Sequence, residues 1–298
     1  MSIRVYLSIA LALLAVQQKP AIAEPRRALV IGNGAYSFAP LSNPVNDVRR
    51  MERALTSVGF EVARLENATK PQIEAGLRDL SERLTPDAVS LFYYAGHGVQ
   101  VGGHSYLIPT KARIDSAEAV RIEAIDLNEV VEQVTRGHGR VNIIILDACR
   151  NSPFDQPEMT LADGEARRID VERKNVRFRG ISGGLAPIEA PAGILIAYAT
   201  APGKTASDGT GRNGLYTSEL IREISTPGIS IEQVFKETRR SVIDKSQGAQ
   251  TPWESSSLIG DFTFQTGSAA PAGLPAGPTT TTTPGSKCFT FNNKEYCE

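Results

Sequence analysis

The chain has 298 residues, a formal net charge of −1 and three cysteines, and 41% of its residues are hydrophobic. A near-neutral charge argues against a nucleic-acid-binding protein, because such proteins usually carry clustered Lys and Arg, so we expect no nucleic-acid partner. The hydrophobic content is sufficient for a real core, and the length allows one large domain or two small ones.

The first 23 residues have the three parts of a secretory signal peptide. Arg4 supplies a positive charge, an apolar stretch follows at 7–16, and Ala21-Ile22-Ala23 is a small-residue cleavage site. The apolar stretch is too short to span a bilayer, which favours cleavage over the alternative, an uncleaved membrane anchor. We therefore expect a secreted or periplasmic mature chain that starts near Glu24 and has no transmembrane segment.

Short apolar runs, rich in β-branched and aromatic residues and bounded by turn residues, are typical of buried strands. Such runs lie at 89–97, 141–149 and 194–199, and we also expect a first strand at 28–31, a second at 61–65 and a last one at 262–264.

Amphipathic segments separate these runs, and several begin at residues that cap helices. Strands that alternate with such helices indicate a parallel α/β sheet with right-handed crossovers. The predicted helices begin at Pro44, after Thr69 (with Gln72) and after Asp126 (with Glu129), and span 215–224 and 231–243, the last after Ser230 (with Gln233).

Three later stretches depart from this pattern. Residues 151–190 are polar and highly charged, and so long a loop in a compact domain is usually functional or disordered. Residues 267–286 are rich in Pro, Ala and Thr, which predicts a disordered linker. In 287–298, Cys288 and Cys297 flank alternating aromatics, which favours a short hairpin closed by a disulfide, as fits an oxidising compartment.

Cys149 is then the one free thiol of an exported chain, which calls for an explanation. It ends one apolar run, and His97 ends an earlier run. In a parallel sheet both would lie at the carboxyl edge, where ligands bind, and there a thiol and an imidazole can act as nucleophile and base. The alternative is a buried core thiol, since free cysteine is often buried.

The two motifs that end these runs, Tyr93-Tyr94-Ala95-Gly96-His97-Gly98 and Leu146-Asp147-Ala148-Cys149-Arg150, resemble those of the caspase/metacaspase clan of cysteine peptidases. The bacterial metacaspase-like (orthocaspase) branch is the nearest match, and the resemblance covers about 27–264. It implies a caspase-like three-layer sandwich, with a mostly parallel six-stranded sheet and helices on both faces. A peptidase domain at 24–266 would comprise a large-subunit part (24–150), an inter-subunit loop (151–190) and a small-subunit part (191–266).

The resemblance also implies a role for each residue of the two motifs. Cys149 would be the nucleophile that forms an acyl-enzyme, and His97 the general acid/base. The backbone N–H groups of Gly98 and Cys149 would form the oxyanion hole, and no third member of the triad is required. A glycine after the histidine lets the backbone approach the substrate carbonyl closely.

In metacaspases the aspartate before the cysteine lines the S1 pocket, and an Asn-Asp pair after the first strand adds a second acid. Asp147 and Asp47 stand in these places, so the resemblance implies protein or peptide substrates cut after Arg or Lys. Pro44-Val45 replaces the usual cysteine before the pair, and the alternative for Asp47 is a solvated first-turn carboxylate. We interpret Arg49 and Arg50 as exposed helix charges.

The basic residues between Arg167 and Arg179 lie where the large and small subunits of the family join. An enzyme specific for basic residues would convert its own zymogen by cutting there; the alternative is a solvated loop. The chemistry requires no cofactor and no metal ligands are predicted. The resemblance leaves calcium open as an activator, with Asp155, Asp163 and Asp170 as loose candidates for binding it.

Two other functions compete with the endopeptidase. One is a non-catalytic caspase-like module that holds a peptide, although such proteins usually lack the cysteine or the histidine and this chain has both. The other is a peptide ligase or transpeptidase, which would use the same nucleophile and differ only in the acceptor.

Overall fold

The computed structural model describes residues 24–149, 158–160, 166–168, 181–183, 185–188, 190–201, 213–266, 288–291 and 294–297. The expected signal peptide and linker lie outside these residues, as does most of the 151–190 loop. Within the described part of the chain, no helix is both long enough and apolar enough to cross a membrane.

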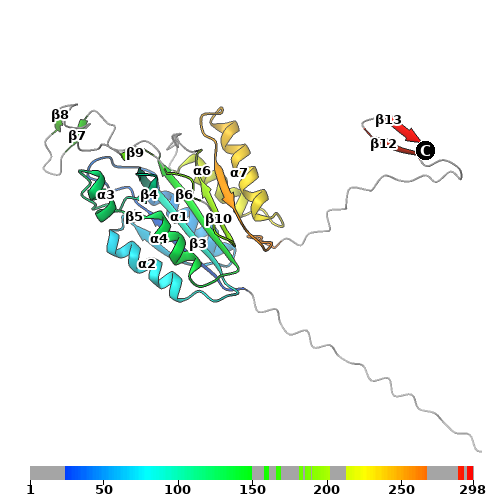
Figure 1. Cartoon of the computed structure of the whole chain (residues 1–298), viewed down its shortest axis with the longest axis horizontal. Coiled ribbons are helices and arrows are strands. Elements are labelled where there is room, and N and C mark those ends of the chain that lie inside the picture. Colours follow the sequence, from blue (N-terminus) through cyan, green and yellow to red (C-terminus); the bar gives the residue numbers. More distant parts are fainter. Residues whose placement is uncertain are drawn as a thin grey trace, which may run out of the picture.

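A path of hydrogen-bonded strands in the order β11-β10-β6-β3-β1-β2 forms the centre of the fold (Figure 1). Neighbours are parallel except β10 and β11, which are antiparallel. The predicted α/β class and mostly parallel sheet are confirmed. The strands are β1 (Arg26–Gly32), β2 (Glu61–Glu66), β3 (Val89–Val101), β6 (Val141–Cys149), β10 (Ile194–Tyr198) and β11 (Trp253–Ser256).

Helices cover both faces of this sheet and give it three layers. Successive strand residues point to opposite faces, so Val30 of β1 packs in one core cluster while Leu29 and Ile31 pack in the other. Figure 1 shows α2 and α4 in front of the sheet. The first face carries α1 (Pro44–Ser57), α6 (Leu215–Ile224) and α7 (Ile231–Lys245), and the second carries α2 (Lys70–Glu82) and α4 (Leu127–Thr135).

Side-chain caps fix where two of the predicted helices begin. Before α2, the Thr69 N–H donates to Oε1 of Gln72 at 2.9 Å. Before α4, Oδ1 of Asp126 accepts from the N–H of Asn128 at 2.8 Å. These bonds satisfy backbone and side-chain groups that a helix start would otherwise leave to water.

The prediction of a last strand at 262–264 is wrong. The edge position belongs to β11, whose Trp253 packs on Tyr198 with ring centroids 5.7 Å apart. The carbonyls of Thr263 and Phe264 accept instead from the guanidinium of Arg26, at 3.2 and 2.6 Å. Phe262 and Phe264 are both buried, but burial does not specify a backbone partner.

Sequence analysis missed several short elements, most of them beyond His97. β3 continues past His97 and pairs antiparallel with both β4 and β9. Part of the 151–190 loop is therefore ordered as strands rather than structureless. The missed elements are β4 (His104–Leu107), α3 (Ala117–Glu123), β5 (Ile125–Asp126), β7 (Glu158–Thr160), β8 (Ala166–Arg168) and β9 (Ile181–Gly183).

The C-terminal segment forms a two-stranded antiparallel pair, β12 (Cys288–Phe291) and β13 (Lys294–Cys297). Cys288 lies directly opposite Cys297 in this pair. Opposite residues on antiparallel strands are close in space, which is the arrangement that the expected disulfide requires.

Candidate active site

The backbones of His97 and Cys149 lie side by side. β3 and β6 are adjacent parallel strands, and their register places His97 opposite Cys149 at the carboxyl end of β6. Neighbouring strands are about 4.8 Å apart, so the two residues that sequence analysis selected are brought together. The structure describes Cys149 by its backbone only.

The ring of His97 is held by a backbone carbonyl. The ring is almost fully buried, and Nε2 lies 2.6 Å from the carbonyl oxygen of Ala39. A carbonyl oxygen only accepts, so Nε2 carries the hydrogen and Nδ1 is the basic nitrogen of the neutral imidazole. Ala39 thus orients the ring, and the sequence carries no signal for it because every residue has a carbonyl.

Aromatic residues around His97 hold both its ring and its backbone. The rings of Tyr36 and Phe38 lie 4.5 and 5.8 Å from the imidazole, between ring centroids. The Tyr36 hydroxyl accepts from the His97 N–H at 3.0 Å, and the Tyr94 hydroxyl donates to the His97 carbonyl at 2.9 Å. The loop after β1 is therefore part of the site, although the sequence did not single it out.

Two glycines in the histidine motif lie where an added side chain would come too close to neighbouring atoms. A Cβ at Gly96 would lie 2.6 Å from Oη of Tyr36 and 2.7 Å from Oη of Tyr94. A Cβ at Gly98 would lie 2.8 Å from Cδ2 of Leu185, a buried residue that follows β9. Leu185 therefore brings the end of the 151–190 loop against the candidate oxyanion donor.

The two candidate S1 aspartates converge at the start of α6. Oδ2 of Asp47 and Oδ2 of Asp147 lie 3.2 and 3.3 Å from the position that a Cβ on Gly214 would take. Gly214 is the N-cap of α6, where the helix dipole favours negative charge. Asp47 is 3% exposed, which contradicts the alternative of a solvated first-turn carboxylate.

Asp47 is held by the residues just before α6. Its Oδ1 accepts from the Gly214 N–H at 3.0 Å and from Nδ2 of Asn213 at 2.8 Å. Arg50 in turn donates to Oδ1 of Asn213 at 3.1 Å. The interpretation of Arg50 as an exposed charge is therefore wrong, because it is half-buried and supports the Asp47 partner. Arg49 is exposed as expected and pairs with Glu66.

Asp147 is held by side chains. Oγ1 of Thr217 donates to Oδ2 of Asp147 at 2.6 Å, and Oη of Tyr93 lies 2.6 Å from Oγ1 of Thr217. Burial, followed by the nearby charge of Asp147, raises the pKa of both Tyr93 and Tyr216 well above the usual range. Both tyrosines therefore stay protonated beside an acidic site.

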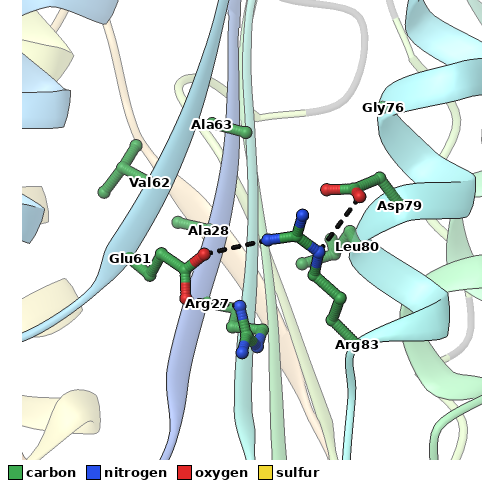
Figure 2. A pocket seen from close by; sticks show the side chains of 9 residues that line it. All are labelled: Arg27, Ala28, Glu61, Val62, Ala63, Gly76, Asp79, Leu80 and Arg83. Atoms are coloured by element: carbon green, nitrogen blue, oxygen red, sulfur yellow. Dashed lines mark hydrogen bonds and ion pairs between the residues drawn. The ribbon is translucent and has the colours of Figure 1, made fainter.

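A pocket lies at the opposite end of the sheet, and its charged lining residues are paired with one another. It lies between the first residues of β1 and β2 and the second half of α2, with Arg27, Arg83, Glu61 and Asp79 among its lining (Figure 2). Arg83 binds Glu61 at 2.9 Å and Asp79 at 3.0 Å, and Arg27 also pairs with Glu61. Its cations are thus neutralised by its own acids, and ligands of parallel sheets bind at the other edge.

Metal ligands are not gathered in the described part of the chain: no three His, Cys, Asp or Glu residues there could hold an ion together. The loose calcium candidates Asp155, Asp163 and Asp170 lie outside the described residues.

Comparison with known proteins shows the family to which the chain belongs. Residues 25–263 match the family model of the caspase domain. A stretch of 131 residues, 43% of the chain, is 28% identical to the mucosa-associated lymphoid tissue lymphoma translocation protein 1 of Homo sapiens, and equally to its homolog in Mus musculus. The chain spans only 15% of the length of these curated relatives.

Among solved structures, caspase-1 from Spodoptera frugiperda is similar, with a TM-score of 0.58 at 17% identity over 82% of this chain and 93% of that one. At this identity the likeness shows the fold. Fold and site together define an α/β protein with a histidine and a cysteine at the carboxyl edge of a caspase-like sheet. The chain belongs to the caspase-domain family of cysteine peptidases.

Proposed function

We propose that this protein is an exported cysteine endopeptidase that cleaves peptide bonds after Arg or Lys. The observation that carries the proposal is the double convergence at one sheet edge: His97 opposite Cys149, and Asp47 with Asp147 around Gly214. The first pair supplies the chemistry, and the second supplies negative charge for a cationic P1 side chain.

In this mechanism His97 takes the thiol proton of Cys149, the resulting thiolate attacks the scissile carbonyl carbon, and the N–H groups of Gly98 and Cys149 stabilise the oxyanion. His97 protonates the leaving amine as the C–N bond breaks, which leaves a thioester. It then takes a proton from water, whose oxygen attacks the thioester and releases the thiolate. The hydrogen bond from Nε2 to Ala39 keeps the ring oriented throughout and stabilises its charged form.

The two carboxylates explain the choice of a basic P1 residue. Hydrogen bonds donated to a carboxylate favour its ionised form, and a cationic P1 side chain that pairs with two carboxylates in one pocket forms charge-assisted hydrogen bonds. Asp47 accepts from Gly214 and Asn213, and Asp147 accepts from Thr217.

Self-processing is part of the proposal. Arg167 and Arg168 lie in β8, inside the inter-subunit loop that an enzyme with this preference would cut. Export rests on the signal-like residues 1–23, and calcium enters as an activator to be tested.

The test is hydrolysis of matched fluorogenic peptides with Arg, Lys or Asp at P1, with and without calcium, by the mature protein and by Cys149→Ala. We expect turnover of the Arg and Lys peptides that the variant lacks, and intact mass should show cuts between 151 and 190 in the wild type only. Cleavage of the Asp peptide alone would refute the acidic pocket, and no Cys149-dependent turnover would refute the peptidase.

Asp47→Asn separates specificity from chemistry, since an amide keeps the shape of the carboxylate and loses its charge. We expect kcat/KM for the Arg peptide to fall by about tenfold or more, as for the loss of a charge-assisted contact. Labelling of Cys149 by iodoacetamide should be unchanged. An unchanged kcat/KM would remove Asp47 from the pocket.

A further inference from the structure

A pair of buried hydroxyl groups stands behind Asp147. Thr217 lies in the first turn of α6 and Tyr93 lies in β3, and both are 0% exposed. Their oxygens are 2.6 Å apart, and Thr217 is 2.6 Å from Oδ2 of Asp147. A chain of hydrogen bonds therefore runs from the central strand through a helix to the strand that carries Cys149.

The hydroxyl hydrogens in this series of hydrogen bonds all point toward Asp147. Thr217 gives its single hydroxyl hydrogen to Oδ2 of Asp147. Thr217 must then accept from Tyr93, which donates. Burial and the charges of Asp147 and Asp47 raise the pKa of Tyr93 far above its usual range, so Tyr93 keeps this hydrogen at any working pH.

Asp147 differs from Asp47 in how it is held. Asp47 accepts from the backbone N–H of Gly214 and from the side chain of Asn213, whereas Asp147 accepts from the hydroxyl of Thr217, which a substitution removes without changing the charge of the pocket. A hydrogen bond to one carboxylate oxygen restricts rotation of the carboxylate plane. Thr217 is therefore one of the contacts that fix the plane of the Asp147 carboxylate.

We propose that Thr217, backed by Tyr93, is a positioning residue that sets the Asp147 carboxylate for bidentate recognition of a P1 arginine and so favours Arg over Lys. The proposal rests on the proposed function. A guanidinium is a planar fork whose paired bonds need a fixed carboxylate plane. An ammonium is a compact charge with rotatable donors and tolerates a turned carboxylate. Loss of the Thr217 hydroxyl should therefore lower kcat/KM more for a substrate with Arg at P1 than for one with Lys.

The experiment compares Thr217→Val, which keeps shape and loses the hydroxyl, with Thr217→Ser, which keeps the hydroxyl, and with Tyr93→Phe. Thr226→Val, at the other end of α6, is the matched control. Steady-state kinetics are measured on peptides that differ only in Arg or Lys at P1. Thermal unfolding of each variant reports separately on folding.

We expect Thr217→Val to lower kcat/KM by about tenfold for Arg and by about threefold or less for Lys, mainly through KM. Tyr93→Phe should move the Arg/Lys ratio in the same direction by less. Thr217→Ser and Thr226→Val should both keep the Arg/Lys ratio of the wild type. Should Thr217→Val not fold, the shift in Tyr93→Phe decides the matter.

An Arg/Lys ratio that stays at the wild-type value in Thr217→Val and Tyr93→Phe, with only the thermal stability lowered, would overturn the proposal and leave the proposed function standing. A wild type that cuts neither peptide in a Cys149-dependent way would overturn the proposed function, and the positioning role with it.

Discussion

Nε2 of His97 donates to the carbonyl oxygen of Ala39 across 2.6 Å, so the orientation of the candidate base is set by the loop that follows β1. The same loop supplies Tyr36, whose hydroxyl accepts from the His97 N–H at 3.0 Å and lies 3.1 Å from the hydroxyl of Tyr94. The histidine is thus held by its ring and by its backbone from one segment, while its own strand fixes its place beside Cys149.

Tyr36→Phe tests this arrangement, because it keeps the ring against the imidazole and removes the hydroxyl. A buried N–H left without its acceptor costs about 1–3 kcal/mol of stability. We expect kcat/KM to fall by about tenfold or more, since a small displacement of the base is costly. The measurement is peptide hydrolysis beside thermal unfolding.

Tyr106→Phe, in the same apolar cluster as Tyr36, is the control for loss of a tyrosine hydroxyl. It should retain activity within about twofold, a change of less than 0.5 kcal/mol in transition-state binding. Equal losses in the two variants would mean that the hydroxyl of Tyr36 has no special part in holding His97.

Gly214→Ala probes the meeting point of the two aspartates. The added methyl would lie 3.2 Å from Oδ2 of Asp47 and 3.3 Å from Oδ2 of Asp147, so it must push both carboxylates aside. We expect KM for Arg and Lys peptides to rise by about tenfold with kcat little changed, the signature of lost substrate binding. The loss of an N-cap glycine should cost only about 1 kcal/mol of stability. Unchanged KM values would place the P1 side chain elsewhere.

The sequence predicted the strands that bear His97 and Cys149, because fully buried parallel strands leave continuous apolar runs, but it did not predict that β3 continues past His97 to Val101. It also predicted the aspartate pair, through the family resemblance. It could not predict Ala39, Asn213 or Thr217. Every residue has a backbone carbonyl, so no sequence pattern identifies the one that contacts a histidine. A threonine in an amphipathic helix likewise gives no indication of the distant strand that it contacts.

The edge strand of the sheet is another feature that the sequence did not predict. The run at 262–264 has the alternation of a strand, yet the residues are held by the side chain of Arg26, while the polar β11 takes the edge. Alternation reports which side chains are buried. Which backbone pairs with which is decided by tertiary contacts that a local pattern does not contain.

Gly98→Ala tests the contact with Leu185. The new Cβ would lie 2.8 Å from Cδ2 of Leu185 and 3.2 Å from Cβ of Ala148, so Leu185 or the backbone of residue 98 must move. Because the Gly98 N–H is the candidate oxyanion donor, we expect kcat/KM to fall by at least about tenfold.

The double variant Gly98→Ala/Leu185→Ala gives the methyl room and should recover most of that loss. Leu185→Ala by itself should cost about 2–4 kcal/mol of stability, as buried leucines do, with activity retained. If the double variant is as impaired as Gly98→Ala, the clash with Leu185 is not the cause.

Arg26→Met tests how the chain after β11 is tied to the start of β1. Arg26 donates to the carbonyls of Val58, Thr263 and Phe264 and lies over the ring of Phe262. Removing it takes the side-chain donor from three partly buried carbonyls, so we expect a loss of about 2–4 kcal/mol in the free energy of unfolding. Its place at the amino end of β1, away from the candidate active site, predicts an unchanged KM.

Arg27→Met is the matched control one residue along. Arg27 pairs with Glu61, which is 61% exposed, and exposed pairs contribute about 1 kcal/mol or less. Urea unfolding of both variants measures the difference. A similar fall in stability for the two would mean that the carbonyl contacts of Arg26 contribute no more than a surface ion pair, and that apolar packing of the aromatic residues at 262–264 holds the segment.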